Sequence, residues 1–174
     1  MIDPPSQILI GIGANLPSAE LGSPRATCEA ALEALQQEGL VLAGVSNWYK
    51  SAPVPASSQP WYVNGVIAVQ TAMSPAKLMA LMAAVEGRFG RIRGQKNAAR
   101  TLDLDLIAYG DTVMGWDSDD PNGLTLPHRR MHERGFVLLP LQEIAPQWCH
   151  PVMKLSLQEM IAALDPNQQT IPDE

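Results

Sequence analysis

Apolar and polar residues follow two different periods along this chain, and the change of period predicts the order of its strands and helices. Residues 7–13 ("QILIGIG"), 40–51 and 61–71 are β-rich runs with β-branched and aromatic side chains. Residues 103–110 ("DLDLIAYG") begin with alternating polar and apolar positions, which is the period of a strand. These four segments are predicted to be strands.

Two helices are predicted between these strands, each beginning at a Ser-Pro pair. After Ser23, apolar residues recur at the spacing i, i+3, i+4, i+7, and the pattern stops at Gly39. After Ser74, a second apolar stripe runs to Gly90. Serine is a preferred N-cap, proline fits the first helical turn, and glycine commonly follows the last turn. The chain therefore begins with the order β-α-β-β-α-β.

This order predicts an α+β fold with a ferredoxin-like βαββαβ core. Its antiparallel sheet would carry both helices on one face and leave the other face free as a floor for substrate. An acidic loop at 111–123, a basic segment at 127–136 and an apolar helix candidate at 137–146 follow the last strand. Ser156 and Glu159 form a capping box, which predicts a C-terminal helical extension.

Composition narrows the class of protein. A chain of 174 residues with 46% apolar content fits one globular domain spanning residues 1–174. Its net charge of −6 argues against bulk binding to nucleic acid or to an anionic membrane. The sequence has no signal-like start and no run approaching the ~20 apolar residues of a membrane span, so we expect a cytoplasmic monomer with small-molecule partners. Cys28 and Cys149 show no C-x-x-C pairing and are predicted to be reduced core residues.

Asp103 and Asp105 are the first candidates for chemistry. Residues i and i+2 of a strand point to the same side, so the two carboxylates lie together while Leu102, Leu104 and Leu106 face the core. Two neighbouring charges are relieved by a retained proton, an arginine partner or a divalent metal. The spacing leaves these alternatives open, together with simple solvent exposure.

A basic segment precedes this pair. Residues 86–105 hold five basic and three acidic residues in a chain that is acidic overall. The loop 91–100 ("RIRGQKNAAR") would suit a polyphosphate with bound Mg²⁺, although a solvated basic loop is an alternative. Glu86 lies near the end of a predicted helix, where a carboxylate opposes the helix dipole unless it serves another group or a neighbouring arginine.

These residues resemble the signature of the 6-hydroxymethyl-7,8-dihydropterin pyrophosphokinase family of folate biosynthesis. In that signature an arginine is followed, after two residues, by two aspartates around one hydrophobic residue and then by two apolar residues, as in 100–107 ("RTLDLDLI"). The resemblance spans about residues 8–164. It also includes "GIGANL", "YKSAPVPASSQPWYVNGV" and "LPHRRMHERGFVLLPLQEIAP", in that order.

The resemblance implies transfer of pyrophosphate from ATP to the hydroxymethyl group of the reduced pterin, with attack on the β-phosphorus and release of AMP. It implies that Asp103 and Asp105 hold two Mg²⁺ ions, and that Arg91 and Arg100 stabilise the charge of the moving group. The positions that match nucleotide contacts are Glu86, Arg93, Arg100, Thr125, His128 and Arg134.

The resemblance also implies a pterin pocket. The positions that match it are Ser51, Ala52, Val54, Tyr62, Asn64 and Phe136. Tyr62 and Phe136 would sandwich the ring, since a flat heteroaromatic ligand favours two π faces, and the Asn64 amide offers both a donor and an acceptor to the polar edge. Two positions depart from some family members: Ala83 replaces a glutamine and Asn97 an aromatic residue. Both bear on adenine binding and loop closure.

Other sites are possible on single motifs. "GIGANL" lacks the third glycine of a dinucleotide-binding loop, and close strand-loop packing explains it better. His128 and His132 have zinc spacing without a third ligand, so we expect His128 to contact phosphate and His132 to lie on the surface. In "DSDDPNG", Pro121 interrupts a calcium-loop pattern, which favours a solvated acidic loop.

Two other functions would use the same residues. A nucleotidyltransferase would use the aspartate pair for attack on the α-phosphorus, and a non-catalytic sensor would bind nucleotide or pterin on the same fold. Identification of the nucleotide product distinguishes them.

Overall fold

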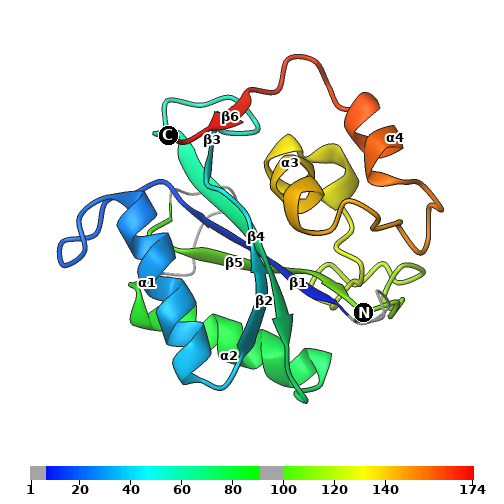
Figure 1. The fold of residues 1–174 in the computed structure, drawn as a ribbon, viewed down its shortest axis with the longest axis horizontal. Helices are drawn as coiled ribbons and strands as arrows, with labels where there is room; N and C mark the ends of the chain where they lie inside the picture. Colours follow the sequence, from blue (N-terminus) through cyan, green and yellow to red (C-terminus); the bar gives the residue numbers. More distant parts are fainter. Residues whose placement is uncertain (1–6, 91–99) are drawn as a thin grey trace.

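The computed structural model of the protein describes residues 7–90 and 100–174. Its six-stranded sheet has the order β5-β1-β4-β3-β6, with β2 also paired to β4, and every pairing is antiparallel (Figure 1). The strands are β1 (Ile8–Ala14), β2 (Val41–Val45), β3 (Tyr49–Ser51), β4 (Tyr62–Gln70), β5 (Asp103–Tyr109) and β6 (Thr170–Pro172).

The two predicted helices are confirmed as α1 (Pro24–Gln37) and α2 (Pro75–Arg88), and they cover one face of the sheet (Figure 1). Each begins at its serine N-cap, whose side chain accepts a backbone N–H of the first turn. Gly39 and Gly90 follow the helices with positive φ angles of 94° and 82°. The core between the layers includes Ile10, Leu35, Ile67, Leu78, Met82 and Leu104.

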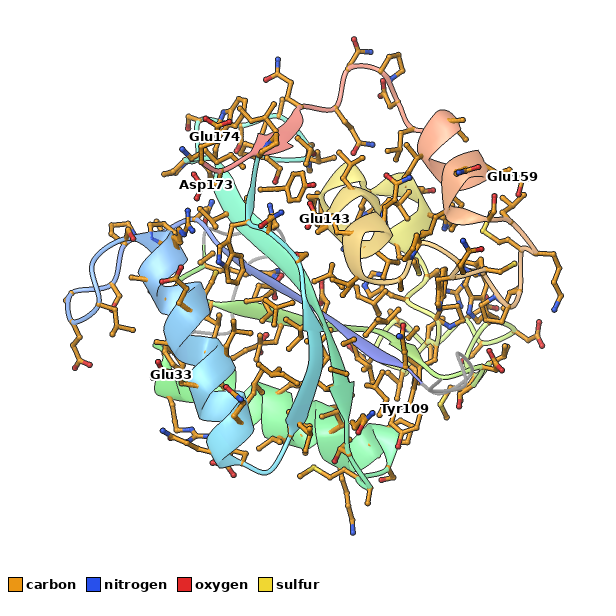
Figure 2. All side chains as sticks on the ribbon, in the orientation of Figure 1. Glu33, Tyr109, Glu143, Glu159, Asp173 and Glu174 are labelled. Atoms are coloured by element: carbon orange, nitrogen blue, oxygen red, sulfur yellow. The ribbon has the colours of Figure 1, made fainter. Side chains whose placement is uncertain are left out.

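The single strand predicted at residues 40–51 is wrong, because the chain forms the separate strands β2 and β3. Between them Trp48 turns into the core, where a Cβ on Gly65 would lie 2.8 Å from its ring. The backbone N–H of Asn47 donates to Glu143 at 2.8 Å. Figure 2 shows Glu143 on the side of α3 (Gly135–Ile144) that faces these strands. Side-chain contacts from distant parts of the chain therefore interrupt the strand.

The second face of the sheet is only partly free, which corrects the prediction of an open floor. A short 3₁₀ helix, η2 (Met131–Glu133), leads into α3, and α4 (Leu157–Ala162) follows. Both α-helices lie on the opposite side of the sheet from α1 and α2 (Figure 1). They bury a second core with Leu9, Val66, Ala68, Ile107, Leu138, Leu141 and Met160. The ferredoxin-like core and its C-terminal helical extension are confirmed.

Three smaller features complete the fold. Ser156 and Glu159 form the predicted capping box of α4. Cys28 is buried, and burial raises its pKa to about 12, whereas Cys149 is exposed, so the prediction of a core position is wrong for Cys149. None of the described helices has the length and apolar character needed to span a membrane.

Candidate active site

Two glycines of β1 leave the free part of the second face without side chains. Gly13 lies opposite Asn64 of β4 and Asp103 of β5, and Gly11 lies opposite Asp105. A Cβ on Gly13 would come within 2.8 Å of Asn64 Oδ1, and one on Gly11 within 3.4 Å of Ile107 Cδ1. Because β1 presents bare backbone, the side chains of its two neighbours can reach over it. This role of the "GIG" motif was not predicted from the sequence.

A cavity of about 230 Å³ opens above this floor. It brings together eleven residues that the sequence analysis named: Ser51, Ala52, Val54, Tyr62, Asn64, Arg100, Asp103, Asp105, His128, Arg134 and Phe136. It is also lined by residues that the sequence analysis did not name, among them Gly11, Gly13, Pro53, Gln59, Ile107 and Val137.

Asp103 and Asp105 face the cavity from β5, while Leu104 and Leu106 are buried on the opposite face, as alternation predicts. Arg134 Nη1 lies 3.7 Å from Asp105 Oδ2. Within the described residues, no group of three or more His, Cys, Asp or Glu side chains could hold a metal ion. A cation here would rest on two carboxylates and take its other ligands from phosphate and water. Mg²⁺ is bound in this way at many phosphate sites.

Arg100 is positioned by Asn15, a residue that the sequence analysis did not name. Asn15 Oδ1 accepts the backbone N–H of Arg100 at 2.8 Å, and the Asn15 N–H donates to the Arg100 carbonyl at 3.1 Å. Its side-chain Nδ2 donates to Gln59 Oε1 and to the Pro60 carbonyl, each at 3.1 Å. Asn15 is 1% exposed. It therefore links the end of β1 to the start of β5 and to the loop before β4.

The cationic side of the cavity is partly buried. Burial, the largest single effect, lowers the pKa of Arg100, but Asp103, Tyr62 and Asp105 together outweigh it and the pKa is raised. Burial lowers the pKa of Arg134, and Asp105 only partly opposes the shift. The pKa of His128 falls to about 4, chiefly through burial and then through Arg134. His128 Nδ1 accepts the Arg130 N–H at 3.1 Å, so its neutral ring carries the proton on Nε2.

The other wall suits a flat polar ring. Asn64 Nδ2 donates to Ser51 Oγ at 2.6 Å, and both residues are buried at the floor of the cavity. Tyr62 and Phe136 line the same cavity from β4 and from the first turn of α3. The Arg134 guanidinium lies 5.6 Å from the centre of the Phe136 ring. This wall offers aromatic surface beside hydrogen-bonding groups.

Two named residues do not line the cavity. Glu86 is 4% exposed, and its Oε1 accepts the backbone N–H of Leu104 at 2.7 Å. Its position near the end of α2 is thus explained by a bond to the outer edge of β5. Thr125 lies outside the cavity lining. Arg91, Arg93 and Asn97 lie outside the described residues.

His132 had been expected to lie on the surface, but its side chain is only partly exposed. Its side chain is 24% exposed, and its Nδ1 atom is buried with no hydrogen-bond partner among the described residues. Its ring centre lies 6.2 Å from that of His150, a fully buried histidine between Trp116 and Trp148. The tryptophans are distant in sequence from His132, so no local pattern marked this cluster.

Comparison with known proteins decides the family. The model of 7,8-dihydro-6-hydroxymethylpterin-pyrophosphokinase matches residues 9–146. The chain belongs to this family. It is therefore an ATP-dependent pyrophosphokinase of folate synthesis, and the resemblance of its signature is confirmed.

Several family members named 2-amino-4-hydroxy-6-hydroxymethyldihydropteridine pyrophosphokinase are similar over most of their length. The Synechocystis protein is 38% identical over 157 residues, which are 90% of this chain and 75% of that protein. The Haemophilus influenzae protein is 39% identical over 78% of this chain and 79% of its own length. The Pseudomonas aeruginosa protein is 35% identical over 90% and 91%.

Solved structures confirm the family fold. A Plasmodium falciparum HPPK-DHPS triple mutant with SDX-DHP superposes with a TM-score of 0.68 at 12% identity, over 90% of this chain. An HPPK-DHPS in complex with substrates gives a TM-score of 0.65 at 13% identity. This chain spans 44% and 43% of those two chains, respectively.

Proposed function

We propose that this pyrophosphokinase transfers the β,γ-pyrophosphate of ATP to the hydroxymethyl oxygen of 6-hydroxymethyl-7,8-dihydropterin and releases AMP. The observation that carries the proposal is the position of Asp103 and Asp105. They stand at the edge of a side-chain-free floor, with arginines beside them and an aromatic, amide-bearing wall across the floor. One cavity thus offers surfaces for both substrates.

The pterin would lie between Tyr62 and Phe136. Aromatic side chains provide large contact surfaces for a flat ring. Asn64 is held by its bond to Ser51, which leaves its carbonyl oxygen and its second N–H to bind the polar edge of the pterin. Backbone groups of Ala52 and Val54 would complete the recognition of that edge. The bare backbone of Gly11 and Gly13 allows the hydroxymethyl group to approach the aspartates.

Asp103 and Asp105 would hold the Mg²⁺ ions, and we propose two. Their side chains are 21% and 35% exposed, which leaves the carboxylate oxygens accessible from the cavity. When bound, Mg²⁺ neutralises phosphate oxygens and orients the reacting groups. One residue of the pair faces Gly13 and the other Gly11, so both carboxylates border the place proposed for the acceptor oxygen.

The protein's own part in this reaction is positioning and electrostatics. Arg100 and Arg134 would bind phosphate oxygens after loosening their pairs with the aspartates. His128, neutral with its proton on Nε2, would donate a hydrogen bond to phosphate. We assign Arg91 and Arg93 to the triphosphate and Glu86 and Thr125 to nucleotide contacts by family resemblance.

The test is the fate of ATP labelled at the γ-phosphate, incubated with Mg²⁺ and the reduced pterin alcohol. The label should appear in the pterin product together with one further phosphate, and AMP should form in equal amount. Stoichiometric ADP would indicate an ordinary kinase, and labelled free pyrophosphate a nucleotidyltransferase. Pterin-dependent nucleotide binding without turnover would indicate a sensor. Each of these three results contradicts the proposal.

A further inference from the structure

The N-cap residue of α3 does not cap the helix with its own side chain. Arg134 occupies the N-cap position and makes no capping hydrogen bond, since its guanidinium has only donors and reaches toward Asp105. The backbone N–H of Gly135 donates instead to Gln168 Oε1 at 3.0 Å. Gln168 Nε2 donates to the carbonyl of Glu133 at 2.6 Å. The side-chain amide of Gln168 is therefore bonded to the residues on both sides of Arg134.

The next two residues bond to the opposite wall of the cavity. The carbonyl of Gln169 accepts the N–H of Ala52 at 3.1 Å, and Thr170 of β6 pairs with Ser51 of β3. Figure 1 shows this segment running from α4, above α3, to β6 beside β3. Three consecutive residues thus connect the wall containing Ser51 and Ala52 to the wall that begins at Arg134.

Both ends of this connection are fixed. A Cβ on Gly135 would lie 3.3 Å from Thr170 Oγ1 and 3.5 Å from Gln168 Oε1, so the segment packs directly on the helix start. Beyond β6, Asp173 pairs with Lys50 Nζ at 2.8 Å, and its side chain is 8% exposed. Figure 2 shows Asp173 beside the end of β6.

We propose that Gln168 is a positioning residue, which sets the separation of the two walls that bind the pterin. The inference rests on the proposed function, because it takes Phe136 and the Ser51–Ala52 wall as pterin contacts. Gln168 lies beyond the residues 9–146 that match the family model. Without its two bonds, the start of α3 would be free to shift, and Arg134 and Phe136 would move with it.

The adjacent Gln169 provides a matched control, because its side chain is exposed and its bond to Ala52 uses only the backbone. Gln168→Met should weaken pterin binding about tenfold, which corresponds to about 1.4 kcal/mol, whereas Gln169→Met should bind as the wild type does. Pterin titration measures the affinity of each variant, and steady-state kinetics measure its pterin KM and kcat. Amide exchange of Gly135 should accelerate only in Gln168→Met.

The split between KM and kcat separates positioning from a purely structural role. Loss of folded protein would lower the apparent kcat and leave the pterin KM unchanged, whereas displaced walls raise the pterin KM. Gln168→Glu keeps the acceptor for Gly135 but places a carboxylate oxygen against the Glu133 carbonyl, so its pterin affinity should also fall.

An unchanged pterin affinity and KM in Gln168→Met overturns the inference. If that variant does not fold, Gln168→Glu decides alone, and wild-type affinity in it overturns the inference. A wild-type protein that neither binds nor pyrophosphorylates the pterin refutes the proposed function instead. In that case, amide exchange of Gly135 still reports whether Gln168 holds the start of α3. Equal exchange rates in the wild type and Gln168→Met would refute the claim that the Gln168 side chain fixes this helix start.

Discussion

The guanidinium of Arg100 lies 2.8 Å from the carboxylate of Asp103, and the two side chains are 27% and 21% exposed. The guanidinium therefore compensates the negative charge of the Asp103 carboxylate at the cavity. Asp105 has the longer contact, 3.7 Å to Arg134. Ligand binding at these carboxylates must loosen such pairs, which couples the anionic and cationic parts of the site.

Asp105→Asn should remove most turnover and leave the fold intact, because it halves the carboxylate charge at the cavity without changing side-chain volume. Losing several kcal/mol of metal-assisted stabilisation of the transition state should lower kcat by roughly a hundredfold or more. Asp111→Asn, an identical change at an exposed position after β5, is the control. Steady-state rates at limiting Mg²⁺ measure the difference, and near wild-type activity in Asp105→Asn would contradict the metal assignment.

Gly13→Ala should weaken pterin binding by about tenfold, because the added methyl group would lie 2.8 Å from Asn64 Oδ1 and displace that amide. Gly87→Ala is the control: it lies in α2, and its added Cβ would meet nothing within 4 Å. The helical change should leave pterin affinity unaltered and raise stability by roughly 0.5–1 kcal/mol. Equal pterin affinities in both variants would show that Asn64 does not require its present position.

Glu86→Ala should lower the free energy of unfolding by about 1–3 kcal/mol, since the buried N–H of Leu104 loses its acceptor. Glu86→Gln keeps an acceptor oxygen and should recover much of this loss. Urea unfolding measures both variants, and the KM for ATP tests the separate assignment of Glu86 as a nucleotide contact. A change in that KM without any loss of stability would make the nucleotide role the dominant one.

His150 should make the protein less stable in acid. It is fully buried, and its Nδ1 accepts the N–H groups of Val152 and Met153, which requires a neutral ring. Burial, and then His132, lower its pKa from 6.5 to about 4. The unfolded chain therefore takes up the proton first, so stability is complete above pH 6.5 and is lost as the pH falls toward 4.

Urea unfolding at pH 7.5 and 4.5 tests this prediction. His150→Asn offers an oxygen acceptor that does not titrate, so its loss of stability between these pH values should be smaller by on the order of 1–2 kcal/mol. His128 remains in this variant and shifts in the same direction, so some pH dependence should persist. Identical pH dependence in both proteins would exclude His150 as a contributor.

The sequence by itself determined the elements whose causes are local. The serine caps of α1 and α2 and the capping box of α4 depend on residues within one helical turn. The placement of Asp103 and Asp105 on one side of β5 follows from the two-residue period of a strand. The order of motifs was sufficient to recognise the family.

Only the tertiary structure decided the features that depend on contacts between distant residues. The predicted strand breaks at residues 46–48 because the Trp48 ring packs against Gly65 and the Asn47 N–H donates to Glu143. The position of Glu86 near the end of α2 is explained only by its bond to the backbone of Leu104. The start of α3 is capped by Gln168, which lies 33 residues further along the chain. Asn47 and Glu143 alone lie 96 residues apart, and neither periodicity nor local propensity records which distant partner packing will supply.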